Sequence, residues 1–194
     1  MNPTGGQGAV FLDKDGTLLS DLPFNVDPGK MRFAQGAREA LEAFATTDIP
    51  LFVVSNQAGI AKGLFEEAAL EGVEQRLGQM FEECGARMAA FYYCPHHPDG
   101  SVPAYACACC CRKPEPGMLF QAMTEHGTVS AKSWMVGDIL DDIEAGRRAG
   151  CKTILVDNGN ETEWDLSPRR VPDHRVPTLD EAARVILRAA SQAS

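Results

Sequence analysis

Hydrophobic residues along the chain follow two alternating patterns, short continuous runs and longer stretches with helical spacing. Continuous runs are typical of strands buried on both faces of a parallel sheet. The runs cover residues 9–12, 51–54, 91–93, 133–136 and 152–156. Apolar residues three and four positions apart predict amphipathic helices. The stretches with this spacing are residues 37–46, 66–83, 116–126, 140–149 and 179–190.

This alternation of strands and helices predicts an α/β fold with a Rossmann-like, mainly parallel sheet flanked by helices. Three of the segments between these predicted elements have a distinctive composition. Residues 16–35 mix prolines and glycines with scattered apolar residues, and we expect an irregular flap over the end of the first strand. Residues 58–63 carry two glycines and predict a loop, and residues 94–111 are rich in cysteine.

Composition limits the kinds of protein that the chain can be. Its 194 residues, 44% of them hydrophobic, fit one domain over residues 1–194. The net charge of −9 argues against nucleic-acid binding, which normally needs a basic face. We find no apolar run near the ~20 residues of a membrane span and no secretion signal at the start of the chain. We therefore expect a cytoplasmic monomer.

Two carboxylates directly follow the first apolar run. Residues two apart on an extended chain face the same side, so Asp13 and Asp15 point toward one site. Two like charges this close are costly unless a cation lies between them or one carboxyl keeps its proton. The pair therefore indicates a Mg²⁺ site or a nucleophile beside an acid, and the alternative is a solvated, Asp-rich turn.

Other strands also end in polar residues that could share this site. Ser55 follows the second run, Asp138 follows the fourth, and Lys113 follows the cysteine-rich segment. In a parallel sheet the carboxyl ends of the strands meet at one edge, so these side chains would converge there. Carboxylate oxygens suit Mg²⁺, while Ser55 and Lys113 could hold a phosphoryl group.

The order of these residues resembles the haloacid dehalogenase (HAD) superfamily of phosphotransferases. The four motifs of that superfamily match Asp13–Thr17, Ser55, Lys113, and Gly137–Asp138 with Asp142. The resemblance implies a HAD-like fold, with a minimal cap because no large insertion follows the first or the third strand.

The resemblance also implies a mechanism. Asp13 would attack phosphorus and form an aspartyl-phosphate, which splits one difficult displacement into two easier ones. Asp15 would protonate the leaving group and then deprotonate the attacking water. Mg²⁺ held by Asp13, Asp15 and Asp138 would neutralise charge on the phosphoryl group.

Five of the seven cysteines fall between positions 94 and 111, close to two histidines. Three thiolates and one imidazole suit a closed, tetrahedral zinc site. This arrangement resembles the zinc-loop branch of HAD phosphatases, which implies Cys94, His96, Cys109 and Cys111 as the ligands of a structural zinc. The additional Cys107 and Cys110 leave the register of the last two ligands open.

The branch contains heptose bisphosphate phosphatases and histidinol-phosphate phosphatases. The long gap within the zinc loop resembles the former, which implies D-glycero-D-manno-heptose 1,7-bisphosphate, a lipopolysaccharide precursor, as substrate and its 7-phosphate as the group removed. A histidinol-phosphate or broad small-molecule phosphatase is the alternative, followed by a catalytically inactive zinc-loop binding module. The residues that the resemblance places against the substrate are Ser55, Asn56, Gln57, Ala58, Arg112 and Lys113.

Overall fold

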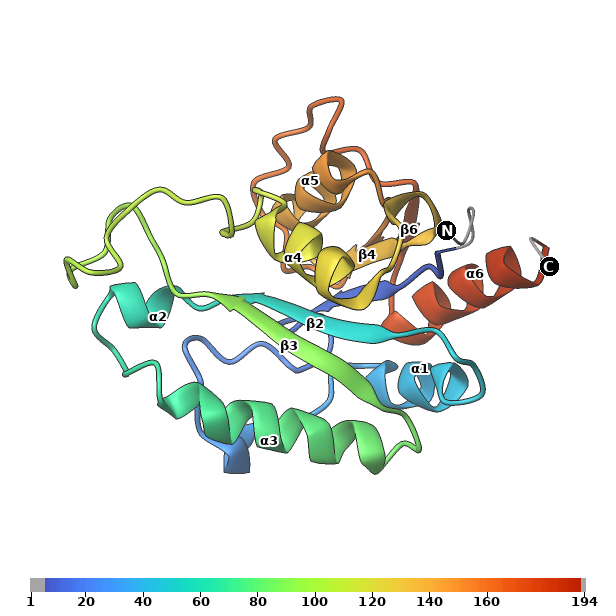
Figure 1. The fold of residues 1–194 in the computed structure, drawn as a ribbon, viewed down its shortest axis with the longest axis horizontal. Helices are drawn as coiled ribbons and strands as arrows, with labels where there is room; N and C mark the ends of the chain where they lie inside the picture. Colours follow the sequence, from blue (N-terminus) through green and yellow to red (C-terminus); the bar gives the residue numbers. More distant parts are fainter. Residues whose placement is uncertain (1–5, 193–194) are drawn as a thin grey trace.

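A computed structural model describes residues 6–192 and contains one six-stranded, parallel sheet with helices on both faces (Figure 1). The strand order is β3-β2-β1-β4-β5-β6. The α/β architecture predicted from the sequence is thereby confirmed. The strands are β1 (Val10–Asp13), β2 (Leu51–Asn56), β3 (Met88–Cys94), β4 (Trp134–Gly137), β5 (Lys152–Val156) and β6 (His174–Val176).

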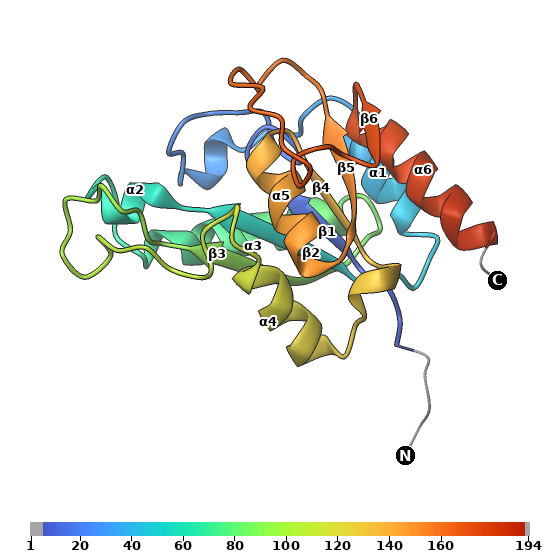
Figure 2. The same ribbon diagram turned by 90° about the horizontal axis from the view of Figure 1, so that it is seen from above.

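Helices cover the sheet on both faces, so the molecule has three layers. Helices α1, α3 and α6 lie on one face, and α4 and α5 lie on the other, as the two perpendicular views show (Figures 1 and 2). The helices are α1 (Ala37–Phe44), α2 (Ala58–Ala61), α3 (Ala69–Glu82), α4 (Gly117–His126), α5 (Leu140–Ala149) and α6 (Leu179–Gln192). No helix in the described part of the chain combines the length and the apolar character needed to cross a membrane.

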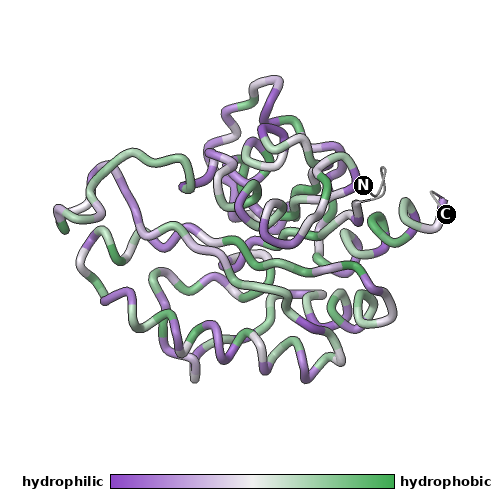
Figure 3. The backbone as a smooth tube through the Cα atoms, in the orientation of Figure 1, coloured by the Kyte–Doolittle hydropathy of each residue, from purple (hydrophilic) through white to green (hydrophobic). Residues whose placement is uncertain are grey.

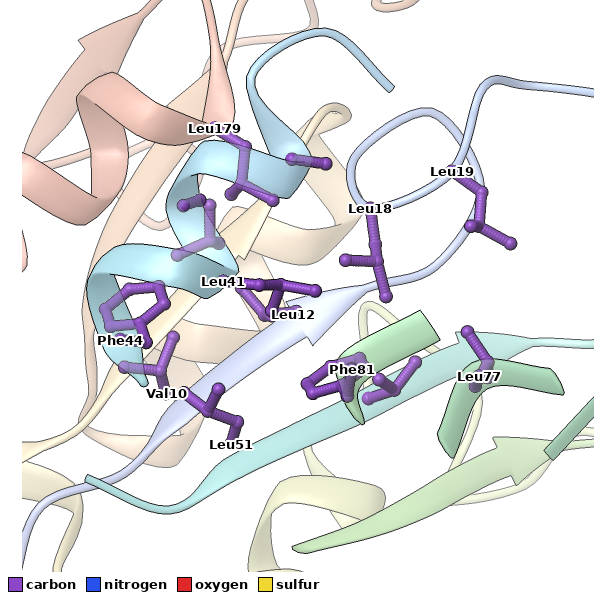
Figure 4. Packing of buried hydrophobic residues seen from close by; sticks show 14 of the residues in the cluster. Val10, Leu12, Leu18, Leu19, Leu41, Phe44, Leu51, Leu77, Phe81 and Leu179 are labelled. Atoms are coloured by element: carbon purple, nitrogen blue, oxygen red, sulfur yellow. The ribbon is translucent and has the colours of Figure 1, made fainter. Parts of the chain in front are cut away.

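The first strand contributes to the cores on both faces of the sheet. Val10 and Leu12 pack in the cluster that contains α1, α3 and α6 (Figure 4). Phe11 points the other way, and its ring stacks on Phe52 with 5.3 Å between the ring centroids. Burying both faces requires the continuous apolar run, because side chains alternate along a strand. In contrast, hydrophobic and hydrophilic residues alternate along α3 (Figure 3).

The flap of residues 16–35 is partly a core element, which the sequence prediction missed. Leu18, Leu19 and Met31 are buried in the same cluster as α1 and α3. Single bridges also join Leu19 to Asp15 and to Phe33. These apolar residues follow neither periodicity, because Leu18 and Leu19 lie in the turn after β1 and Met31 follows a short 3-10 helix, so none of them lies in a long regular element.

Two short elements also differ from the prediction. Residues 58–61 form the four-residue helix α2 inside the expected loop 58–63. Strand β6, at the edge of the sheet, was not predicted, since two of its three residues are exposed and polar. Neither segment is long enough to show a hydrophobic period.

The strand order fixes where a ligand can bind. Strand β1 lies between β2 and β4. After β1 the chain forms β2 and then β3 on one side of β1, and only afterwards crosses to β4 on the other side. Open parallel sheets bind ligands at such a switch point, where the connections on the two sides diverge. The carboxyl ends of β1, β2 and β4 therefore define the edge at which the predicted residues should meet.

Candidate active site

Three carboxylates from two neighbouring strand ends form one group at this edge. Asp13 ends β1, Asp138 follows β4, and Asp142 lies in the first turn of α5. One oxygen of each lies within 4.8 Å of the others, and all three residues are buried. The turn after β1 passes close to Asp138, and a Cβ at Gly16 would lie only 2.0 Å from Asp138 Oδ2. Glycine at this position, with φ of +88°, therefore allows the two strand ends to approach.

Lys113 is the buried cation of the site, with 2% of its side chain exposed. Its Nζ pairs with Asp13, lies 2.6 Å from Asp142 Oδ1, and donates to the carbonyl of Val54 at 3.0 Å. Burial favours loss of the Lys113 proton, but the charges of Asp13 and Asp142 raise the pKa of Lys113 above its usual value. Lys113 therefore stays charged between Asp13 of the first motif and Asp142 of the fourth.

One cation does not balance three carboxylates. Burial, and next the charge of Asp13, raise the pKa of Asp138 to about 7. Burial also raises the pKa of Asp142, with a further contribution from Asp13 and Asp138, although Lys113 opposes the shift. Excess negative charge among buried oxygen donors is the environment that a divalent cation stabilises. The donor set therefore fits Mg²⁺.

Asp15 lies outside this group of carboxylates. Its Oδ1 accepts from Lys14 Nζ at 2.6 Å, and its Oδ2 faces Gln57 Nε2 at 3.5 Å. Burial raises the pKa of Asp15, the charge of Asp13 raises it further, and Lys14 opposes both effects. A carboxyl whose pKa is raised beside a second carboxylate suits the general acid of an acid–base pair.

The end of β2 supplies Ser55, which contacts a neighbouring side chain, and Asn56, which contacts the main chain of Lys113. Ser55 is buried, and its hydroxyl accepts from Gln57 Nε2 at 2.7 Å. Asn56 donates to the carbonyl of Lys113 and accepts from its N–H, both at 3.0 Å. Both polar atoms of the Asn56 side-chain amide thus bind the main chain of Lys113. Ala58 is half-buried at the start of α2.

Some of these residues line one cavity of about 240 Å³ at the carboxyl edge of the sheet, whereas Gln57, Ala58 and Asp142 do not. Besides the predicted residues, its walls include Asp21 from the flap and Ile139 and Asn160 from the two loops after β4 and β5. The lining residues that were predicted from sequence are Asp13, Asp15, Ser55, Asn56, Lys113 and Asp138.

The cysteine-rich loop brings four possible metal ligands together. The Sγ atoms of Cys94, Cys109 and Cys111 are 2.9–3.4 Å apart, and His96 Nδ1 lies 3.7 Å from Cys94 and 3.5 Å from Cys111. All four ligand atoms lie within 4.8 Å of one another. Cys107 and Cys110 are exposed and outside the cluster. Three sulfurs and one nitrogen in this arrangement suit a soft or borderline metal ion such as zinc.

This cluster connects directly to the active site through the chain after Cys111. The backbone N–H of Arg112 donates to Cys109 Sγ at 3.4 Å, and its Nη1 lies 3.5 Å from the carbonyl of His96. Lys113 is the next residue. The conformation of the cysteine-rich loop therefore determines where the Lys113 side chain enters the active site.

Known proteins match both the sequence and the fold. The HAD-hydrolase-like family model matches residues 110–182. The chain is 38% identical over 152 residues to the D-glycero-beta-D-manno-heptose-1,7-bisphosphate 7-phosphatase of Yersinia pestis, covering 78% of this chain and 81% of that protein. It is 36% identical over 168 residues to the Escherichia coli protein of the same name, covering 82% and 88%. The chain belongs to the HAD-like phosphatase family.

A solved structure extends this match beyond the HAD motifs. The D,D-heptose 1,7-bisphosphate phosphatase from B. bronchiseptica, complexed with magnesium and phosphate, superimposes with a TM-score of 0.75 at 26% identity. The match covers 94% of this chain and 99% of that one. The resemblance to HAD phosphatases seen in the motifs is thereby confirmed over almost the whole chain.

Two contacts of this HAD site were absent from the sequence prediction. Asp142 was matched to the fourth motif without a role, but it pairs with Lys113 and its Oδ2 accepts from the N–H of Ile139 at 3.3 Å. A four-residue spacing from Asp138 into a helix could have indicated this inward position. Asn160, whose amide contacts Asp138, had no local signal, since it lies in a polar loop.

Proposed function

We propose that the protein is a Mg²⁺-dependent phosphatase that removes the 7-phosphate of D-glycero-D-manno-heptose 1,7-bisphosphate through an aspartyl-phosphate. The observation that carries the reaction is the contact of the Asp13 carboxylate with buried Lys113, beside Asp138 in a single cavity. The names of the relatives support the substrate.

In the first step an oxygen of Asp13 forms a bond to phosphorus, while the bond from phosphorus to the sugar oxygen breaks. Asp15 gives its proton to the departing sugar oxygen, which its raised pKa favours. In the second step water attacks the phosphorus of the aspartyl-phosphate and gives a proton back to Asp15. Asp13 is then released as a carboxylate with inorganic phosphate.

Lys113 and the metal site provide charge for this transfer. Asp13 and Asp138 would hold Mg²⁺, which when bound neutralises charge on the transferring phosphoryl group. Lys113 forms an ion pair with Asp13 and places a second positive charge beside the nucleophile. Ser55 offers its hydroxyl, and Arg112 its guanidinium, to the phosphate oxygens.

We further propose a structural zinc bound by Cys94, His96, Cys109 and Cys111. Tyr105 from this loop donates to Glu67 Oε2 at 2.7 Å, and Tyr93 donates to Glu67 Oε1 at 3.0 Å. Zinc would join the two ends of the loop, while the bond from Tyr105 fastens the middle of the loop to Glu67, which also accepts from Tyr93 of β3. Reduced thiols are expected in the cytoplasm, where we place the protein as a single-domain monomer.

Phosphate release from both anomers of the heptose bisphosphate and from histidinol phosphate tests the function. We expect the heptose bisphosphate to have the highest kcat/KM, and Asp13→Asn to abolish turnover while the zinc content and the Tm of the protein stay nearly unchanged. Lys62→Met, an exposed residue, is the control. Comparable phosphate release by the Asp13 variant would refute the mechanism, and a preference for histidinol phosphate would refute the substrate.

A further inference from the structure

The connection between β5 and β6 contacts three parts of the active-site framework. It lies beside α5 in both views of the fold (Figures 1 and 2). Asn158 Nδ2 donates to the carbonyl of Gly16 at 2.6 Å, behind the first motif. Asn160 Nδ2 donates to Asp138 Oδ2 at 2.7 Å, and Glu161 Oε2 accepts from the N–H of Leu140 at 2.7 Å. A short polar segment therefore joins the ends of β1, β4 and β5.

Asp138 is held through both of its carboxylate oxygens. Thr17 Oγ1 donates to Oδ1 at 3.1 Å, and Asn160 donates to Oδ2. Two donors on opposite oxygens fix the rotation of the carboxylate as well as its position. The site is also tightly packed, since a Cβ at Gly16 would lie 2.5 Å from Asn160 Nδ2.

An asparagine has the right chemistry for this contact. Its amide donates a hydrogen bond but carries no charge, so it orients Asp138 without placing a competing positive charge beside the carboxylate. A lysine or arginine in the same place would compete with that cation. Thr17, which holds the other oxygen, is neutral as well.

The loop itself is fastened to α5, so Asn160 is held in place although it is exposed. Arg170 Nη2 lies 2.7 Å from Asp141 Oδ1, and Arg170 Nε lies 2.7 Å from Glu144 Oε2. The backbone N–H of Asn160 also donates to Asn158 Oδ1 at 3.1 Å. These contacts on both sides of Asn160 keep its amide directed at Asp138.

We propose that Asn160 is a positioning residue that orients Asp138 as a ligand of the divalent cation. This inference rests on the proposed role of Asp138 in Mg²⁺ binding. Groups that hydrogen-bond to metal ligands typically change metal affinity by 10- to 100-fold when they are removed. Thr17 keeps one oxygen in place, so we expect a loss of about tenfold, at the lower end of that range.

Binding of Mn²⁺ to the full-length, zinc-loaded protein, followed by electron paramagnetic resonance, tests the inference directly. Mn²⁺ shares the oxygen-ligand preference of Mg²⁺ and avoids soft thiolates. Asn160→Ala should bind Mn²⁺ about tenfold more weakly than the wild type. Thr162→Ala, an exposed change in the same loop, should bind Mn²⁺ like the wild type.

Kinetics and melting separate positioning from a general structural effect. In Asn160→Ala the Mg²⁺ concentration for half-maximal rate should rise by about the same factor, while the KM for the sugar phosphate at saturating Mg²⁺ and the Tm stay unchanged. Unaltered Mn²⁺ binding by Asn160→Ala, with normal binding by the wild type, would overturn this inference alone. A wild type that binds no Mn²⁺ would overturn the proposed metal site and this inference together.

Discussion

Replacing Lys113 by methionine removes the buried cation while keeping most of the side-chain volume. Asp13 and Asp142 would then lose their shared partner inside a site in which all three residues are buried. Breaking a buried ion pair by deleting one member costs about 3–5 kcal/mol, because the remaining charge keeps its desolvation penalty. We expect Lys113→Met to lose stability in this range at pH 8 and to lose turnover.

The carboxylates that remain determine how the stability lost in Lys113→Met changes with pH. Burial raises the pKa of Asp142 to about 8 even with Lys113 present, and without Lys113 the pKa should rise further. A carboxyl whose folded pKa lies above its unfolded value of about 3.9 stabilises the fold when protonated and loses that contribution as pH rises. The stability lost in Lys113→Met should therefore be smaller at pH 5.5 than at pH 8.

Urea denaturation at both pH values, without added Mg²⁺, measures this effect. Adding Asp142→Asn to Lys113→Met removes one of the two unpaired charges, and we expect it to restore part of the stability at pH 8 but no turnover. Lys62→Met changes an exposed lysine and should stay within ~0.5 kcal/mol of the wild type. A Lys113→Met protein with wild-type stability at pH 8, or with the same loss at both pH values, would refute the reasoning.

Two further substitutions test the loops that surround the site. Cys109→Ser should lose most of its zinc and melt at a lower temperature, whereas exposed Cys107→Ser should keep both; a full zinc content in the Cys109 variant would rule out this ligand. Asn56→Ala removes both bonds to the main chain of Lys113, which should cost about 1–3 kcal/mol in urea denaturation and lower kcat. An unchanged kcat would show that Lys113 is positioned without Asn56, and exposed Gln121→Ala is the control.

Elements of the fold could be predicted where buried residues recur at the spacing of a helix or form a continuous run in a strand. The helix expected over residues 37–46 corresponds to α1, whose buried residues Ala37, Ala40, Leu41 and Phe44 have the predicted spacing. Strand β1 follows its apolar run to within a residue. The flap residue Leu18 and strand β6 were missed, because their burial or pairing depends on distant segments rather than on a local period.

Local sequence motifs were enough to predict the phosphatase class and to propose the residues of its site. Asp13, Asp15, Ser55, Lys113 and Asp138 match the HAD motifs in order. All but Lys113, which follows the cysteine-rich loop, come at or just after the ends of parallel strands, and such ends meet at one edge of the sheet.

The contacts among those groups depend on the tertiary structure. It pairs Asp15 with Lys14, joins Asp142 to Lys113, and brings Asn160 against Asp138 across 22 positions of sequence. It also separates Cys107 and Cys110 from the cluster formed by the other three cysteines of the loop and His96. These contacts arise between loops from different strands, and their distances depend on the packing of the whole sheet rather than on any pattern within one segment.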